Sequence, residues 1–216
     1  MQIPPINALL AATALAAAIV AAASFRFPTL VRSYAFSTLC LGLLVVGIGI
    51  IRNEPSLYVL ALVSVTLKTF IIPALLMRAA RRSGMAMRLT AVVRPASTYL
   101  ILGVLVGVVT FAASRSPFAS SADPGYLLTV AVAMFTVGFA MMVMRRDLLS
   151  QVMGFLVMEN GIAAFSFAVI HDLPFLVELG FLMTLTAGIV LMGTVSSRVR
   201  ELYGTESTQA LRELID

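Results

Sequence analysis

Charged residues are scarce in this sequence. Only 12% of its 216 residues are Asp, Glu, Lys or Arg, whereas a soluble globular domain has about 25%. Hydrophobic residues make up 60% of the chain, and the mean hydropathy is +1.02. This composition excludes an ordinary soluble enzyme and indicates an integral membrane protein. Because the loops between the apolar runs are short, the length leaves no room for a soluble catalytic domain.

Cysteine and histidine are nearly absent, since the chain has one of each, Cys40 and His171. These two residues cannot supply the ligands of an iron–sulfur cluster, a zinc site or a haem, and a single cysteine cannot form a disulfide within the chain. No glycine-rich phosphate-binding loop follows a strand pattern either. We therefore expect no cofactor, no metal and no catalytic residues of a redox or hydrolytic enzyme in this chain alone.

Long apolar runs dominate the sequence instead, and they predict an all-α, polytopic membrane protein with about seven transmembrane helices. A helix needs about 20 apolar residues to cross a hydrocarbon core of about 30 Å. The expected spans lie near residues 4–24, 34–51, 57–77, 95–114, 126–144, 149–170 and 174–197. They form a single transmembrane domain over residues 1–200, and residues 201–216 form a short cytoplasmic tail.

The basic residues are divided unevenly between the two predicted faces of the membrane. The net charge is +5, but the arginines lie in short connections rather than in a basic patch, so nucleic acid is not an expected partner. Two of the fourteen arginines, Arg52 and Arg115, fall on one face, and the other twelve fall on the opposite face. By the positive-inside rule the N-terminus is outside, and the C-terminus and the 78–94 connection are cytoplasmic.

Two ionisable residues are predicted to lie near the middle of the bilayer. Lys68, the only lysine, is 11 residues into the third span, and Glu159 is 10 residues into the sixth, which places both roughly 15 Å deep. A charge at the bilayer centre costs about 2.5–3.5 kcal/mol, so such residues usually face protein or water and mark proton or ion paths. Glu159 could exchange charge with Lys68 or with a lysine of an adjacent subunit. A buried Lys–Glu pair that only holds the helices together is the alternative.

Several neighbouring residues extend this polar region. Pro73 lacks an N–H donor and is expected to kink the third helix close to Lys68. Asn160 adds a polar side chain next to Glu159, for which an interhelical hydrogen bond is the simpler explanation. Glu178, near the outer end of the seventh span, is either the mouth of a path or an interfacial carboxylate. In the fourth span, residues 103–107 form a GxxxG step that is consistent with close helix packing.

Three segments of the chain resemble hydrogenase-4 component E. They are Lys68–Pro73 (KTFIIP), Gly154–Gly161 (GFLVMENG) and Phe175–Gly180 (FLVELG). Their order, the chain length and the expected helix count agree with that family over essentially the whole chain. The family consists of polytopic membrane subunits of energy-converting nickel–iron hydrogenase and formate hydrogenlyase complexes. The resemblance implies that nickel, iron–sulfur clusters and electron transfer belong to other subunits.

The last three expected helices, residues 126–197, are also similar to subunit K of respiratory complex I. That subunit has glutamates in its second and third helices, on the proton-translocating axis. The first glutamate corresponds to Leu156 here, and Glu159 follows three residues later on roughly the same helical face. The second corresponds to a position near Thr184, which cannot titrate, so Glu178 is the nearest carboxylate on that helix.

The resemblance therefore implies a non-catalytic subunit of a complex-I-like membrane hydrogenase, next to antiporter-like subunits in a bacterial or archaeal cytoplasmic (inner) membrane. Its proton- or ion-path residues would be Lys68, Glu159, Asn160, Glu178 and Thr184. The main alternative is a stand-alone cation or small-solute transporter, for which inverted repeats are expected. An intramembrane enzyme is disfavoured because the sequence lacks a catalytic constellation.

Overall fold

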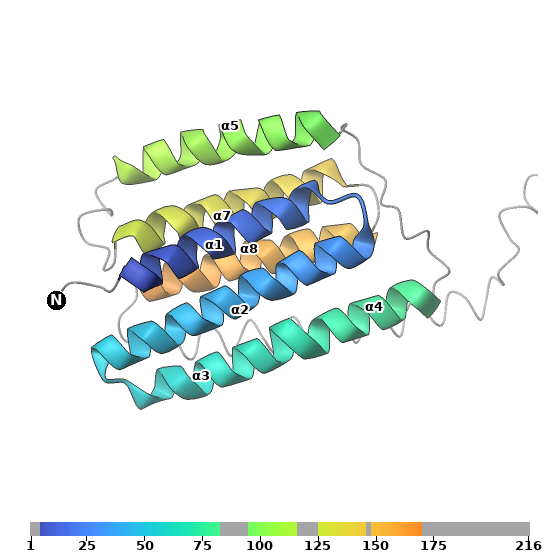
Figure 1. The fold of residues 1–216 in the computed structure, drawn as a ribbon. Coiled ribbons are helices and arrows are strands. Elements are labelled where there is room, and N and C mark those ends of the chain that lie inside the picture. The colour runs from blue at the N-terminus through green and yellow to red at the C-terminus, as the bar shows by residue number, and fades with distance from the viewer. Residues whose placement is uncertain (1–4, 83–94, 116–124, 146–147, 170–216) are drawn as a thin grey trace, which may run out of the picture. The chain divides into compact units, whose positions relative to one another are not determined.

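The computed structural model describes residues 5–82, 95–115, 125–145 and 148–169, and the regular elements in these ranges are helices (Figure 1). In chain order they are α1 (Pro5–Ala23), α2 (Phe27–Arg52), α3 (Pro55–Val65), the π-helical segment η1 (Thr66–Ile71), α4 (Ile72–Arg82), α5 (Pro95–Ser114), α7 (Gly125–Met144) and α8 (Leu148–Val169). The elements α3, η1 and α4 follow one another without a break and form one long helix.

Six helices in the described part of the chain are long and apolar enough to cross a membrane. Their spans are Ile6–Ala23, Phe27–Arg52, Pro55–Arg78, Ala96–Ser114, Tyr126–Met144 and Ser150–Ala168. The first six expected spans are thus confirmed as apolar helices. The second one begins at Phe27 rather than near residue 34, because Pro28 fits the first turn of a helix and Arg32 is included in the following turn. The expected seventh span and the tail lie outside the described residues.

A tight turn joins α2 to α3 and brings Lys68 back alongside α2. Asn53 ends α2 in the left-handed conformation, with φ 54° and ψ 42°, which asparagine tolerates better than most residues. The N–H of Glu54 donates to the carbonyl of Gly49 at 3.1 Å, and Pro55 then starts α3. Because the turn is so short, α2 and α3 are antiparallel neighbours, and α2 also contacts η1 and α4.

Three glycines allow α7 and α8 to pack very closely. A methyl group added at Gly138 would collide with the backbone of Met158, and one added at Gly161 would collide with the backbone of Phe135. A Cβ atom on Gly154 would lie 2.8 Å from Cγ of Met142. Small residues permit this approach of two backbones within a membrane. Since α8 also contacts α2, it is held between α7 and α2.

The helix α5 lies at the edge of the bundle, where it contacts α7 and α1 (Figure 1). Only 11% of its apolar span is buried. A Cβ atom added at Gly103 or Gly107 would meet nothing within 4 Å. The GxxxG step therefore packs against no other helix among the described residues, and the close packing expected of it stays a prediction. The close contacts are made by the glycines of α7 and α8 instead.

Candidate functional site

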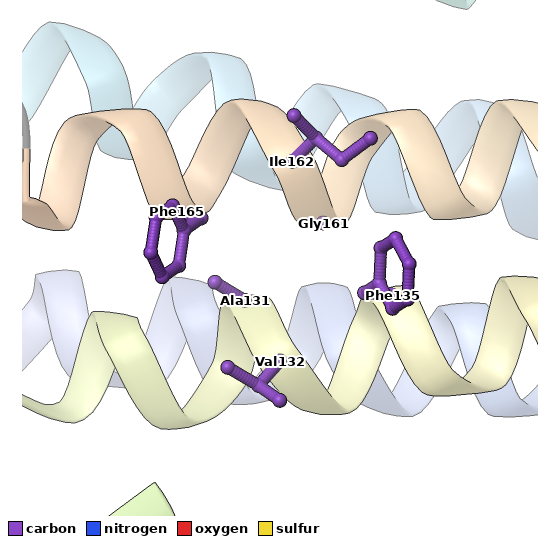
Figure 2. A pocket seen from close by; sticks show the side chains of 6 residues that line it. All are labelled: Ala131, Val132, Phe135, Gly161, Ile162 and Phe165. Carbon is purple, nitrogen blue, oxygen red and sulfur yellow. The ribbon is translucent and has the colours of Figure 1, made fainter. Parts of the chain in front are cut away.

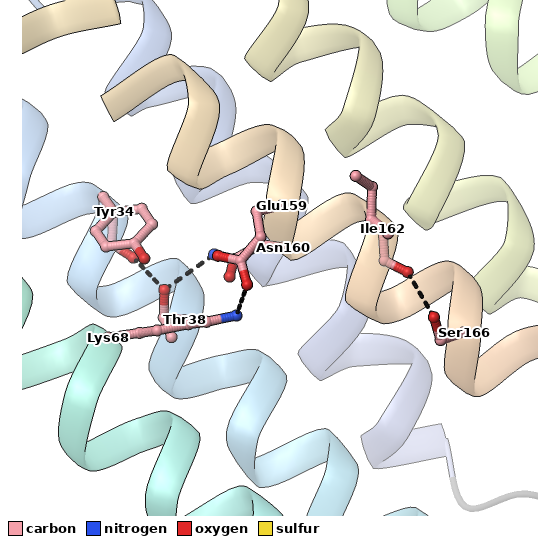
Figure 3. Close-up of polar contacts among 7 residues, drawn as sticks. All are labelled: Tyr34, Thr38, Lys68, Glu159, Asn160, Ile162 and Ser166. Carbon is pink, nitrogen blue, oxygen red and sulfur yellow. Dashed lines mark hydrogen bonds and ion pairs between the residues drawn. The ribbon is translucent and has the colours of Figure 1, made fainter. Parts of the chain in front are cut away.

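Lys68 and Glu159 form a buried ion pair (Figure 3). Nζ of Lys68 lies 2.6 Å from Oε1 of Glu159, and the two side chains are 2% and 1% exposed. Lys68 comes from η1 and Glu159 from the middle of α8. The two residues that were expected at a common depth thus lie in direct contact. The partner of Glu159 is Lys68 of its own chain.

The backbone that carries Lys68 is wound as a π-helix. The N–H of Ile72 donates to the carbonyl of Leu67, five residues back, whereas an α-helix uses the carbonyl four residues back. Lys68 is the buried residue of this segment, while Phe70 is 63% exposed. Single π-helical turns are frequent at functional sites. Pro73, which has no N–H to donate, follows the segment directly, and the kink expected there stays a prediction.

Asn160 connects α8 to α2 beside the ion pair (Figure 3). Its Nδ2 donates to the hydroxyl of Thr38 at 3.0 Å, and that hydroxyl donates to the carbonyl of Tyr34 at 3.1 Å. Asn160 is 2% exposed and Thr38 is 3% exposed. The interhelical hydrogen bond considered for Asn160 is therefore present. Thr38 was not expected at this site from the sequence, although a threonine within a long apolar run is a weak signal of such a contact.

Arg145, at the end of α7, is almost completely buried. Its Nη2 donates to the carbonyl of Ala22 at 2.8 Å and also to the carbonyl of Ser24. Its guanidinium lies 5.0 Å from the centre of the Phe25 ring. The last carbonyls of a helix lack partners within the helix and carry partial negative charge. Arg145 therefore satisfies the end of α1, a role that was not expected from the sequence.

Arg52 makes a similar contact at the opposite end of the bundle. Its Nη2 donates to the carbonyl of Phe167 at 3.3 Å, close to the end of α8 at Val169. Arg52 itself lies in the last turn of α2. The two arginines were expected only to set the membrane topology, whereas the structure places each of them against the C-terminal end of another helix. The Arg52 contact joins α2 to α8, and the Arg145 contact joins the end of α7 to the end of α1.

Two hollows flank α8. A cavity of about 30 Å³ lies beside Lys68 and Asn160, between α2, α3 and α8. A larger groove of about 260 Å³ lies between α7 and α8, and Figure 2 shows its apolar lining. The groove is lined by Ala131, Val132, Phe135, Gly161, Ile162 and Phe165. Its lining has no polar side chain, so it offers a surface to lipid or to another helix but no ligand for an ion.

Two of the expected path residues, Glu178 and Thr184, lie outside the described residues. Within the described ranges, no three His, Cys, Asp or Glu side chains come together to form a metal site. The structure thus brings together Lys68, Glu159 and Asn160 of the expected set, and adds Thr38 to them.

Comparisons with known proteins relate this chain to membrane subunits. Residues 126–216 match the family model described as NADH-ubiquinone/plastoquinone oxidoreductase chain 4L. The chain is 31% identical over 172 residues to the uncharacterized protein Rv0085 of Mycobacterium tuberculosis, covering 78% of this chain and 77% of that protein. It is 26% identical over 149 residues to Hydrogenase-4 component E of Escherichia coli K12, covering 68% of each chain. No solved structure matches this chain significantly.

Proposed function

This chain belongs to the hydrogenase-4 component E family, and we propose that it is a membrane subunit of a complex-I-like assembly in which the Lys68–Glu159 pair forms one step of a proton or ion path. The observation that carries this proposal is the contact of 2.6 Å between two oppositely charged side chains inside transmembrane helices. The match of the C-terminal region to chain 4L supports the complex-I-like character of the assembly.

The energetic cost of the pair supports a function in charge movement. Each charge at the bilayer centre costs about 2.5–3.5 kcal/mol on insertion scales. A buried ion pair regains part of this cost, but apolar residues of similar volume often join two helices equally well or better. A Lys–Glu pair is therefore a costly way to attach η1 to α8 if attachment is its only role. A carboxylate that can take up a proton and an ammonium that can release one provide charge transfer as well.

The outer surface of the bundle supports partners within the membrane. The span of α5 is 11% buried and that of α3 to α4 is 33% buried. Large apolar side chains on α5 point outward, among them Leu100, Val104, Val108 and Phe111. Lipid or the helices of other subunits must cover these surfaces. We propose that the neighbours are antiporter-like subunits, and that nickel, iron–sulfur clusters and electron transfer belong to the rest of the assembly.

The proposal is tested with Glu159→Gln in the intact assembly. Glutamine keeps the shape and the hydrogen-bonding oxygen of the side chain but cannot exchange a proton. We expect ion movement per turnover of the complex to fall at least tenfold, while all subunits still copurify. Glu54→Gln is the matched control, because Glu54 lies in the α2–α3 turn and its side chain makes no cap hydrogen bond.

Two outcomes would contradict the proposal. Full ion movement by a completely assembled Glu159→Gln complex would leave the pair with a structural role only. Recovery of the native protein as an isolated chain that moves cations in liposomes would instead favour a stand-alone transporter. If Glu159→Gln fails to assemble, Lys68→Met combined with Glu159→Gln removes both charges, and the same measurement is made on that variant.

A further inference from the structure

The cavity beside the ion pair has the size and lining of a water site. Its volume of about 30 Å³ exceeds the roughly 10–15 Å³ that one water molecule needs in such a space. A buried water also needs two to four polar partners, and four polar residues line this cavity, namely Thr38, Ser64, Lys68 and Asn160. The apolar groove between α7 and α8 is larger, but it offers no such partners.

The polar residues that line the cavity come from three different helices. Ser64 and Lys68 are four residues apart in the α3–η1 helix, so they share one face of it. Thr38 and Asn160, which are hydrogen-bonded to each other, supply the walls from α2 and α8 (Figure 3). A water molecule between Lys68 and Ser64 would have an ammonium and a hydroxyl as partners.

Small residues keep the space open. Ala61 on α3 and Ala163 on α8 line the cavity, and both are buried. A larger side chain at either position would occupy the volume available to water. Gly42 on α2 also lines the cavity, but a methyl group added there would meet the side chain of Val65, which lies outside the lining. The cavity is therefore kept open mainly by the small residues of α3 and α8.

The cavity extends from the ion pair toward one membrane face only. On α8 its lining runs from Asn160 to Phe167, which is about 10 Å along the helix axis at 1.5 Å per residue. On α3 it runs in the opposite chain direction, from Lys68 back to Leu60. Both directions lead toward the end of the bundle where Arg52 contacts the carbonyl of Phe167. The far part of the lining is apolar, so water belongs at the end that contains Lys68.

We propose that this cavity is a water-binding site that hydrates the Lys68–Glu159 pair and opens it toward the Arg52 side of the membrane. The bound water accepts a hydrogen bond from the Lys68 ammonium. When the ammonium passes a proton to the Glu159 carboxylate, the resulting amine takes up a proton that arrives through the water. The presence of the water follows from the cavity alone, whereas its part in ion movement rests on the proposed function.

The experiment is a structure of the assembled membrane complex at a resolution that shows buried waters, for the native protein and two variants. We expect density for water beside Lys68 in the native complex. Ala163→Val should expel this water while the Lys68–Glu159 contact persists. Ser64→Ala removes one polar partner without adding volume and should weaken the density. Ala112→Val makes the same change on the exposed side of α5 and should leave the density unchanged.

Ion movement by the same complexes tests the second part of the proposal. Ala163→Val should lower ion movement per turnover at least fivefold, and Ala112→Val should not change it. A dry cavity in the native complex, where other buried waters are visible, would overturn the water site. Native ion movement by an Ala163→Val complex without the water would overturn its role in transfer. Neither result depends on Glu159→Gln, which tests the proposed function separately.

Discussion

Nζ of Lys68 and Oε1 of Glu159 lie 2.6 Å apart, although one residue belongs to the third transmembrane span and the other to the sixth. Both side chains are almost completely shielded from the surface of the bundle. Each charge is therefore the main compensation for burying the other. The stability losses caused by replacing the two residues should therefore be coupled and not additive.

The first prediction concerns this coupling. Lys68→Met and Glu159→Leu should each destabilise the protein by about 2.5–3.5 kcal/mol, the cost of one uncompensated charge at the bilayer centre. The double variant has no buried charge, so it should lose much less than the sum of the two single losses. Unfolding in a detergent titration measures all three variants. Additive losses would mean that the two charges do not compensate each other.

The second prediction concerns Arg145 and the end of α1. Arg145→Gln removes a charged donor from the carbonyls of Ala22 and Ser24, and hydrogen bonds of this kind contribute about 1.5–3 kcal/mol each. We expect a loss of at least 1.5 kcal/mol in the same titration. Arg26→Gln removes one positive charge from an exposed position in the adjoining α1–α2 turn, so it should change stability by less than about 0.5 kcal/mol. Equal losses of stability in the two variants would mean that Arg145 does not stabilise the end of α1.

The third prediction concerns the contact between α7 and α8. Gly161→Ala places a methyl group against the backbone of Phe135, and overpacking of this type costs about 1–3 kcal/mol. Gly107→Ala on α5 adds the same methyl group where nothing lies within 4 Å, and alanine favours a helix over glycine by about 1 kcal/mol. In thermal unfolding of the purified chain in detergent, Gly161→Ala should therefore lower the melting temperature and Gly107→Ala should raise it. A neutral Gly161→Ala variant would contradict the close packing.

The fourth prediction concerns membrane orientation. The uneven distribution of arginine places Ser83 in the cytoplasm and Ser120 outside. A cysteine at Ser120 should react with an impermeant thiol reagent applied to intact cells, and a cysteine at Ser83 should react only after the cells are opened. The native Cys40 is buried within α2, so it should contribute little background. Equal labelling, or labelling of Ser83 alone, would contradict the expected orientation.

The sequence by itself was sufficient to predict the class of the protein and the first six spans. Hydropathy is a local property, because each helix must independently present about 20 apolar residues to the bilayer. The same property made Lys68 and Glu159 conspicuous, since they interrupt apolar runs near mid-depth. The start of α2 was misplaced because a helix can continue beyond its apolar run, and no hydropathy signal marks the polar turns at its end.

Only the tertiary structure decided which of these residues meet. The contact of Lys68 with Glu159 depends on the rotation of η1 and α8 about their axes, and the π-helical turn alters that rotation in a way that periodicity does not reveal. The role of Arg145 at the end of α1 depends on which helix ends are neighbours. The GxxxG step of α5 is left exposed, whereas Gly138, Gly154 and Gly161, which form no GxxxG step, bring α7 against α8. Depth in the membrane is set by each helix alone, whereas contacts arise from packing between helices distant in the sequence.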